Sequence, residues 1–209
     1  MRAWIFNFCT KNALFLSALS MCMTTFCHAL PKQVIIIRHA EKYTTGPLIG
    51  QLDSQGLRRA GALASFFTEL DPSTTNPPLF ANGLPTVIFA GRPANLGTNN
   101  TIRCIQTISP TATTLQLPIH SPYTLGQEDE LASFIMNNPR YDGENVLICW
   151  HHPDIGRLVE AFGYHFPLDP YPADRFDLVW LMTFPAPVPP QTLTPILQEL
   201  LYGDSSTPP

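Results

Sequence analysis

The sequence predicts an α/β fold, a three-layer α/β/α sandwich with a mainly parallel central sheet. Two observations indicate this class. Short runs rich in β-branched and aromatic residues, typical of buried strands, alternate with segments whose apolar residues recur at helical spacing. Strands that alternate with helices form parallel sheets covered on both faces. With 209 residues, of which 44% are hydrophobic, the chain has enough apolar surface for one such domain.

The N-terminal segment has the pattern of a secretory signal peptide. Arg2 and Lys11 precede an uncharged apolar stretch over residues 13–26, and a small-x-small site follows at residues 27–29. The stretch is short for a membrane span, and an uncleaved anchor or a buried helix is the alternative. We expect cleavage after Ala29, export to the periplasm or the medium, and one domain over residues 30–209 with a proline-rich C-terminal tail.

Charge and cysteine content narrow the choice of partners. The formal net charge of −4 becomes −6 without the two cations of the first 29 residues. We therefore expect no nucleic-acid partner and no stable membrane association after signal cleavage, and the oligomeric state stays open. Beyond residue 29 only Cys104 and Cys149 remain, both in apolar surroundings, so we expect two buried thiols. No zinc-type Cys/His spacing and no phosphate-cradling glycine loop occurs, and we expect no metal or cofactor.

The expected elements follow one another in a simple order. Strands are expected over residues 34–37, 86–90, 145–150 and 177–183, and helices over residues 54–67, 101–115 and 155–162. Asp53 or Ser54 can cap the first helix, which is expected to bury Leu57, Ala60, Leu63, Ala64 and Phe67. Residues 184–195 hold five prolines and are expected to form a connector or, alternatively, a partner-binding segment. A capped amphipathic segment is expected over residues 196–202.

Basic and imidazole side chains stand where the expected strands end. Arg38 and His39 end the first strand, Arg103 begins the helix after the second, and His151 ends the third. The carboxyl ends of parallel strands share one edge of the sheet, where ligands bind, so these side chains are expected to converge. The alternative is a chance occurrence at unrelated strand ends.

Such a group of side chains suits the transfer of a phosphoryl group. Two guanidinium groups can each bind phosphoryl oxygens in bidentate fashion. A neutral imidazole can attack phosphorus when its other nitrogen donates to a backbone carbonyl. A second, protonated imidazole would stabilise the charge that develops in the transition state, and no metal is required.

Four short elements resemble, in order, the motifs of the histidine phosphatase superfamily, the phosphoglycerate mutase-like proteins. They are Arg-His-Ala-Glu at residues 38–41, with Ala40 in place of the usual glycine, the helix start at residues 53–60, Arg-x-x-Gln-Thr at residues 103–107, and the strand leading to residues 151–153. The resemblance covers residues 34–183. It implies a phosphoglycerate mutase-like fold.

The resemblance also implies roles for the residues at the strand ends. His39 would be the nucleophile that becomes phosphorylated, Arg38 and Arg103 would bind the phosphoryl group, and His151 would be the second imidazole of the pocket. His152 is then either a solvent-facing spectator or an extra contact to the phosphate or the leaving group. Asn99 departs from the family, which usually has Ser or Thr four residues before the second arginine.

Hydrolysis also needs an acid that protonates the leaving oxygen. Glu128 is our candidate, because the smaller branch of the superfamily carries its glutamate between the second helix and the third strand. The alternative is that Glu128 belongs to the solvated first turn of a helix over residues 129–136, where acidic residues favour the helix dipole. Glu41 and Asp154 are the next candidates.

The remaining polar and aromatic residues carry simpler expectations. Lys42, Arg58 and Arg59 are expected to be solvated charges, and His120 and His165 to be structural. Trp150, Tyr171 and Trp180 line either the pocket or the core, which periodicity cannot distinguish.

These observations predict a metal-independent phosphomonoester hydrolase that acts through a phosphohistidine on a small phosphorylated substrate. A phosphomutase of the same family is the first alternative, although the chain lacks the long insertions of the mutases. The second alternative is a catalytically impaired anion-binding domain, against which the complete set of four pocket residues argues.

Overall fold

A computed structural model of the protein describes residues 30–68, 82–93, 101–165, 171–184 and 192–208. The expected signal peptide, Asn99 and most of the proline-rich connector lie outside the described residues. Within the described ranges, no helix combines the length and the apolar character that a membrane span requires.

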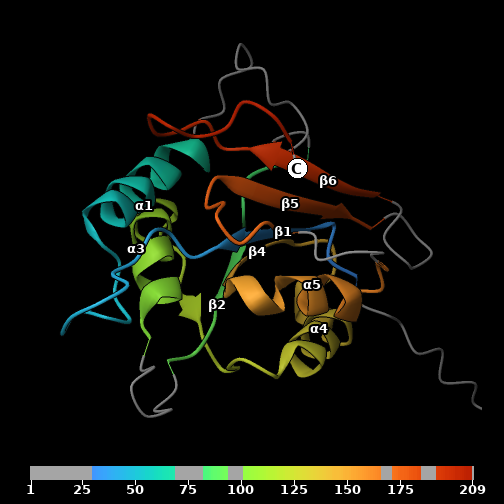
Figure 1. Cartoon of the computed structure of the whole chain (residues 1–209). Helices are drawn as coiled ribbons and strands as arrows, with labels where there is room; N and C mark the ends of the chain where they lie inside the picture. The colour runs from blue at the N-terminus through green and yellow to red at the C-terminus, as the bar shows by residue number, and fades with distance from the viewer. Residues whose placement is uncertain (1–29, 69–81, 94–100, 166–170, 185–191, 209) are drawn as a thin grey trace, which may run out of the picture.

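One six-stranded sheet forms the centre of the molecule, with the strand order β3-β2-β4-β1-β5-β6 (Figure 1). The strands, in chain order, are β1 (Gln33–Arg38), β2 (Val87–Ala90), β3 (Ile119–His120), β4 (Asn145–Trp150), β5 (Leu178–Thr183) and β6 (Thr192–Leu197). β1 to β4 run parallel, whereas β5 is antiparallel to β1 and β6 is antiparallel to β5. The predicted α/β class with a mainly parallel sheet is confirmed.

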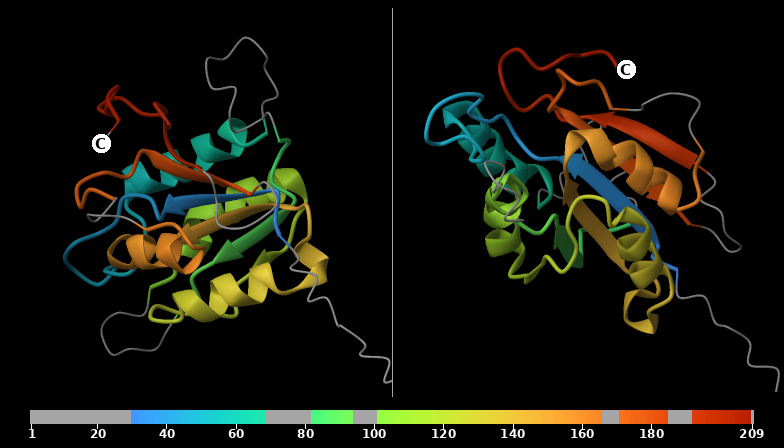
Figure 2. Two further views of the ribbon diagram at one scale, coloured as in Figure 1. Left: turned by 90° about the vertical axis from the view of Figure 1, so that its right-hand side faces the viewer. Right: turned by 60° about the horizontal axis from the view of Figure 1, so that its bottom comes forward.

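Helices cover both faces of this sheet. The helices are α1 (Ser54–Phe66), α3 (Arg103–Leu115), α4 (Glu128–Met136) and α5 (His152–Ala161), and a short 3-10 helix, η2 (Pro139–Tyr141), precedes β4. α1 packs against α3, and α4 packs against α5 (Figure 2). The two pairs make the outer layers of the sandwich.

The alternation of side chains along β1 explains why its sequence is apolar throughout. Val34 and Ile36 pack into the core on the α4 and α5 side, whereas Ile35 and Ile37 pack into the core on the α1 and α3 side. All four are fully buried. A strand buried on both faces has no position for a polar side chain, which makes it recognisable in the sequence.

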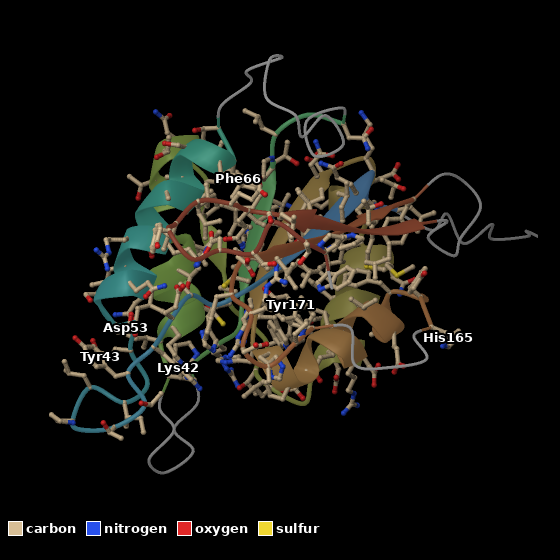
Figure 3. The ribbon with its side chains drawn as sticks, turned by 45° about the horizontal axis from the view of Figure 1, so that its top comes forward. Lys42, Tyr43, Asp53, Phe66, His165 and Tyr171 are labelled. Carbon is tan, nitrogen blue, oxygen red and sulfur yellow. The ribbon has the colours of Figure 1, made fainter. Side chains whose placement is uncertain are left out.

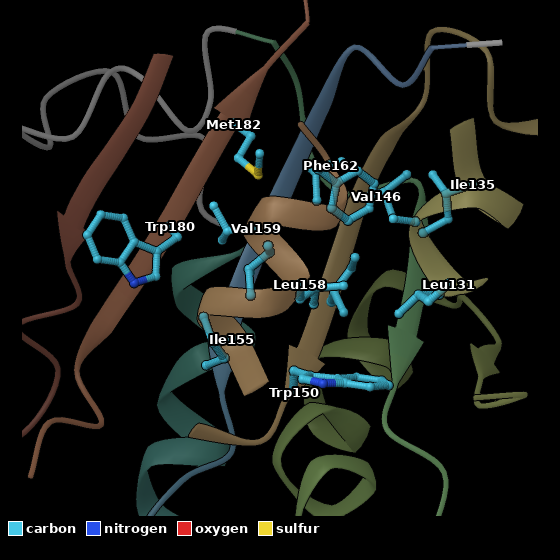
Figure 4. Packing of buried hydrophobic residues seen from close by; sticks show 14 of the residues in the cluster. Leu131, Ile135, Val146, Trp150, Ile155, Leu158, Val159, Phe162, Trp180 and Met182 are labelled. Carbon is cyan, nitrogen blue, oxygen red and sulfur yellow. The ribbon is translucent and has the colours of Figure 1, made fainter. Parts of the chain in front are cut away.

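The sequence did not decide whether three aromatic residues line the pocket or the core, and the structure places all three in the core. Trp150, Tyr171 and Trp180 are all buried members of the cluster beneath α5. Figure 4 shows Trp150 and Trp180 with Ile155 of α5 in this cluster.

The prediction of a capped amphipathic segment over residues 196–202 is wrong. Thr192–Leu197 instead form β6, which pairs along the whole of β5. The backbone of β5 would otherwise be an unpaired edge, and pairing with β6 satisfies its hydrogen-bonding groups. Pro195 is tolerated because β6 is itself the edge strand, where a missing N–H costs little. β3 was not predicted, since two residues are too few for a periodic pattern.

Helix α1 starts as predicted and buries most of the expected face, with two exceptions. The Asp53 side chain caps it by accepting hydrogen bonds from the backbone N–H groups of Gln55 and Gly56. Leu57, expected in the core, is 56% exposed, whereas Arg59, expected in solvent, is 2% exposed. Both expectations are wrong. Ala60, Leu63 and Phe67 are buried as expected, and Gly56 and Arg59 extend the buried face of the helix.

Gly56 allows α1 to lie close to the segment that follows β1. A Cβ atom built on Gly56 would overlap the backbone carbonyl oxygen of Glu41, which follows β1. We expect Gly56→Ala to lower the free energy of unfolding by about 1–3 kcal/mol, as overpacking does, measured by urea denaturation. Gly61 is the matched control, because it lies in the same helix with nothing within 4 Å of its Cβ position. Gly61→Ala should be neutral or stabilising, and equal losses in both variants would contradict the argument.

Candidate active site

The predicted site residues meet beyond the carboxyl ends of β1 and β4. The chain leaves β1 toward α1 on one face of the sheet and leaves β4 toward α5 on the other, and sheets of this kind bind ligands at such a switch point. Arg38 ends β1, His39 follows it, and His151 follows β4 directly. The ring centroids of His39 and His151 are 5.5 Å apart. The predicted convergence of these residues is therefore observed.

His39 is fixed in one tautomer by its own backbone. Its Nδ1 lies 2.8 Å from the carbonyl oxygen of Ala40. A carbonyl oxygen only accepts, so Nδ1 carries the proton and Nε2 keeps its lone pair. The next peptide is also held, because the Ala40 N–H donates to Thr107 Oγ1 at 2.9 Å. The arrangement is the one that a nucleophilic imidazole requires.

The surroundings of His39 keep this imidazole neutral. Burial lowers the pKa of His39 well below its ordinary value of 6.5, and the positive charges of Arg103, His151 and Arg38 lower it further, whereas the hydrogen bond to Ala40 acts in the opposite direction. A neutral imidazole at pH 7 has the lone pair that attack on phosphorus needs.

The titration of His39 tests this description. In the free protein we expect His39 to remain neutral as the pH falls through 6.5, because protonation would place a charge in a buried, already cationic site. NMR titration of the histidine ring resonances measures this, and the spectrum of His39→Ala assigns the signal. A pKa at or above 6.5 for that signal would contradict the electrostatic argument.

Arg38 is oriented by the segment that precedes β5. One terminal nitrogen donates to the carbonyl oxygens of Ala173 at 2.8 Å and Arg175 at 2.7 Å, and the guanidinium carbon lies 3.8 Å from the centre of the Phe176 ring. Its Nε is buried and has no hydrogen-bond partner among the described residues. The plane of the guanidinium group is therefore fixed, while some of its N–H groups remain available to donate to a ligand.

Arg103 is the first residue of α3. Its own motif, residues 103–107, joins it to the loop that carries His39. The Arg103 Nε donates to Thr101 Oγ1 at 2.6 Å. Thr107 Oγ1, which accepts from the Ala40 N–H, donates to the Arg103 carbonyl at 2.8 Å. The positive charge of Arg103 contributes to the lowered pKa of both Arg38 and His39, after the larger effect of burial. The hydroxyl of Thr107 thus ties the second arginine to the nucleophile loop.

His151 is enclosed by small and sulfur-containing residues. A Cβ atom on Gly91, which follows β2, would lie 3.2 Å from its Nε2, so only glycine allows this close approach without a shift. The thiol of Cys104 interacts with His151 and with Cys149, and both cysteines are buried and free, as predicted.

His152 does not simply face the solvent, and its predicted contact to the phosphate or the leaving group stays a prediction. It is half-buried, and its Nε2 lies 2.8 Å from the carbonyl oxygen of Tyr171. This contact attaches α5 to the segment that orients Arg38. His152 is therefore a structural neighbour of the site.

Glu128 is the first residue of α4, and its side chain is fully buried. Its Oε1 accepts hydrogen bonds from the Gly126 N–H and from Trp150 Nε1, both at 3.0 Å, and its Oε2 lies 3.7 Å from Arg157 Nε. The alternative of a solvated first turn fits the exposed Asp129 but not Glu128.

The other two candidate acids differ in their surroundings. Both carboxylate oxygens of Glu41 accept hydrogen bonds from Arg59 at 2.7–3.1 Å, so they are already engaged by this arginine. Asp154, in the first turn of α5, is partly exposed. Burial raises the pKa of Asp154 and the charge of Glu128 raises it further, whereas the charge of His151 lowers it. Asp154 therefore lies within electrostatic range of both Glu128 and His151.

Several contributors to the site could not be identified as such in the sequence. Thr101, Gly91 and Phe176 act through contacts that only the fold creates, and Thr107 was part of a recognised motif without an assigned role. In the part of the chain that the structure describes, no group of three or more His, Cys, Asp or Glu side chains could hold a metal ion.

The comparisons with known proteins concern the fold of the chain. No family model and no curated protein matches the sequence. Among solved structures, the protein histidine phosphatase SixA complexed with tungstate matches with a TM-score of 0.50 and 16% identity over 72% of this chain and 87% of that chain. SixA from Agrobacterium tumefaciens matches with a TM-score of 0.43 and 14% identity over 74% and 92%. A mycobacterial glucosyl-3-phosphoglycerate phosphatase matches with a TM-score of 0.45 and 14% identity over 73% and 91%.

The match to the tungstate-bound SixA concerns the fold. Together with the sheet order and the helical layers, it shows that the chain has the fold of the histidine phosphatase superfamily, as the sequence resemblance predicted.

Proposed function

We propose that this protein is a phosphomonoester hydrolase of the histidine phosphatase superfamily. The observation that carries the proposal is the state of His39, whose Nδ1 is bound to a backbone carbonyl while Nε2 keeps its lone pair. The centroids of the His39 and His151 rings are 5.5 Å apart. The cationic Arg38 and Arg103 lie within electrostatic range of it. The tungstate in the SixA structure, a tetrahedral oxyanion like phosphate, supports this assignment.

The reaction proceeds in two displacements. His39 Nε2 attacks phosphorus, the phosphorus–nitrogen bond forms, and the ester phosphorus–oxygen bond breaks. The alcohol leaves with a proton from an acid. Water then attacks the phosphohistidine and gives a proton back to the deprotonated acid, while the phosphorus–nitrogen bond breaks, which releases phosphate and restores the lone pair on Nε2. Arg38 and Arg103 bind the phosphoryl oxygens, and His151 stabilises the charge of the transition state.

Glu128 and Asp154 are the two candidates for the proton donor. The raised pKa and partial exposure of Asp154 favour it as the group that holds a proton and reaches a leaving oxygen. The buried Glu128, with two hydrogen bonds on Oε1, then acts as the charge that raises the pKa of Asp154. Asp154→Asn and Glu128→Gln separate these roles, because loss of the donor slows esters of poor leaving groups more than aryl esters.

Release of phosphate from 4-nitrophenyl phosphate, measured in the presence of EDTA, tests the proposed activity. We expect turnover that survives EDTA, and a loss of about 10²–10³-fold in Arg103→Ala, since a positioned donor to the transition state is removed. Arg58→Ala is the matched control, because Arg58 is exposed on α1. Inactivity toward a broad panel of phosphomonoesters would favour the anion-binding domain, and phosphoryl exchange without net hydrolysis would favour the mutase.

We also propose that the protein is exported and loses its first 29 residues. The support is the charge and hydropathy pattern of that segment. N-terminal sequencing of the protein recovered outside the cytoplasm should begin at Leu30, and a mature chain that retains Met1 would contradict the proposal.

A further inference from the structure

A second cavity adjoins the candidate active site at Arg103. It measures about 180 Å³ and is lined by Lys42, Tyr43, Thr44, Ile49, Gly50 and Arg103, which we call the Lys42 pocket. Lys42 and Tyr43 lie on the segment that follows β1, below Asp53 in the view of Figure 3. The expectation that Lys42 is an ordinary solvated charge is wrong, because its side chain is half-buried in this wall.

The backbone around the pocket is held in place. Lys42 forms an antiparallel bridge with Leu52, and the Tyr43 N–H donates to the carbonyl oxygen of Gln51 at 3.3 Å. The Ile102 N–H donates to the carbonyl oxygen of Gly50 at 3.2 Å, which joins this loop to the start of α3. Lys42 is thereby presented from a fixed position beside Arg103.

The charge around Lys42 is not balanced by the protein. Among the described residues, no carboxylate lies within ion-pair distance of Lys42, Arg103 or Arg38. Burial lowers the pKa of Lys42, and the charges of Arg103 and Arg38 lower it further, so the three cations repel one another. The charges of Glu41 and Asp174 act favourably on Arg38, but Glu41 is bound to Arg59 and neither acid forms an ion pair with Lys42.

The transferred phosphoryl group does not account for all three cations. Two guanidinium groups already match its oxygens, which leaves the ammonium of Lys42 in excess. A half-buried cation without a partner is costly, and a ligand anion would relieve that cost. Tyr43 and Ile49 add accessible apolar surface to the wall, since Tyr43 is 38% exposed and Ile49 is 46% exposed.

We propose that the Lys42 pocket binds a second anionic group of the substrate, carried on an apolar leaving group that packs against Tyr43 and Ile49. The inference rests on the proposed phosphatase function and adds the substrate class. The cavity has room for about six water molecules at about 30 Å³ each, the size of a small organic acid. A carboxylate and a second phosphate share the required chemistry.

The experiment compares three aryl esters that differ only in the para substituent: phenyl phosphate, 4-carboxyphenyl phosphate and 1,4-phenylene bisphosphate. We expect the wild-type protein to favour the two anionic esters by about tenfold in kcat/KM, and whichever is preferred identifies the second anion. In Lys42→Met this ratio should fall to near one, whereas Lys42→Arg should keep it. The ratio between two esters cancels any general loss of activity, and comparing that ratio between the wild type and Lys42→Met cancels the intrinsic reactivity of each ester.

Lys32→Met is the matched control, because Lys32 is exposed and lies before β1, at the opposite end of that strand. It should keep the full preference. Equal kcat/KM values for the three esters in the wild type, or a preference that survives Lys42→Met, would overturn the inference while leaving the phosphatase function intact.

Calorimetry separates a failure of the inference from a failure of the proposed function. If none of the three esters is hydrolysed, the phosphatase proposal fails, and binding of the same esters to wild type and Lys42→Met tests the pocket directly. Tighter binding of the anionic esters that depends on Lys42 would retain the pocket as a ligand site, and equal binding would refute it.

Discussion

His39→Ala is expected to lose phosphatase activity by about 10⁴-fold or more, because the variant has no nucleophile and cannot form the covalent intermediate. No neighbouring group can replace it. His151 belongs to a different strand end and is enclosed by Gly91 and Cys104. The measurement is kcat/KM for 4-nitrophenyl phosphate with the purified variant.

Two controls show that the loss is chemical. Far-UV circular dichroism and the denaturation midpoint of His39→Ala should match those of the wild type, and the variant should still bind tungstate or vanadate through Arg38 and Arg103. In the wild type, a short incubation with labelled substrate should leave an acid-labile, base-stable label on His39. Residual activity within tenfold of the wild type, or a label on another residue, would refute the assigned role.

The position of the site could be predicted because it follows from chain topology. A buried strand identifies itself by an unbroken apolar run, and in a parallel sheet every such strand ends at the same edge. Arg38, His39 and His151 therefore meet although more than a hundred positions separate the first from the last. The tautomer of His39 depends on a contact with the residue next to it, so local chemistry was sufficient to anticipate it.

The expectations that failed concern residues whose surroundings come from distant segments. Arg59 looks like a solvated charge on an amphipathic helix, yet the C-terminal segment folds over it and supplies Asp204 and Gln198. Lys42 has no periodic pattern and is half-buried because α3 lies beside its loop. β6 forms because β5 offers an unpaired edge, which no local pattern of residues 192–197 reveals. In each case the tertiary contact overrides the local preference.

Arg59→Leu is expected to lower the free energy of unfolding by about 3–5 kcal/mol, the cost of removing one partner from a buried ion-pair network. The Arg59 guanidinium lies 2.7 Å from Glu41 Oε1 and 2.6 Å from Asp204 Oδ1, and it also donates to Gln198 Oε1 at 3.1 Å. Leucine fills the space but leaves two buried carboxylates facing each other. Urea denaturation followed by circular dichroism measures the loss.

The matched variant is Arg58→Leu on the exposed side of the same helix, which should change stability by less than about 0.5 kcal/mol. Neutralising the orphaned acids in the triple variant Arg59→Leu, Glu41→Gln, Asp204→Asn should recover part of the loss. If Arg58→Leu and Arg59→Leu are equally stable, the network contributes nothing.

The same network predicts how stability depends on pH. Burial raises the pKa of Asp204, but its hydrogen bonds to Arg59 and to the backbone N–H groups of Leu201 and Leu200 lower it by more, so the pKa lies below its ordinary value of 3.8. A carboxyl group with a lowered pKa in the folded state stabilises the fold above its unfolded pKa and loses that contribution as the pH falls through the folded value. Wild-type stability should therefore fall below about pH 4, more steeply than that of Asp204→Asn. Parallel pH profiles for the two proteins would show that the Asp204 contact does not stabilise the fold.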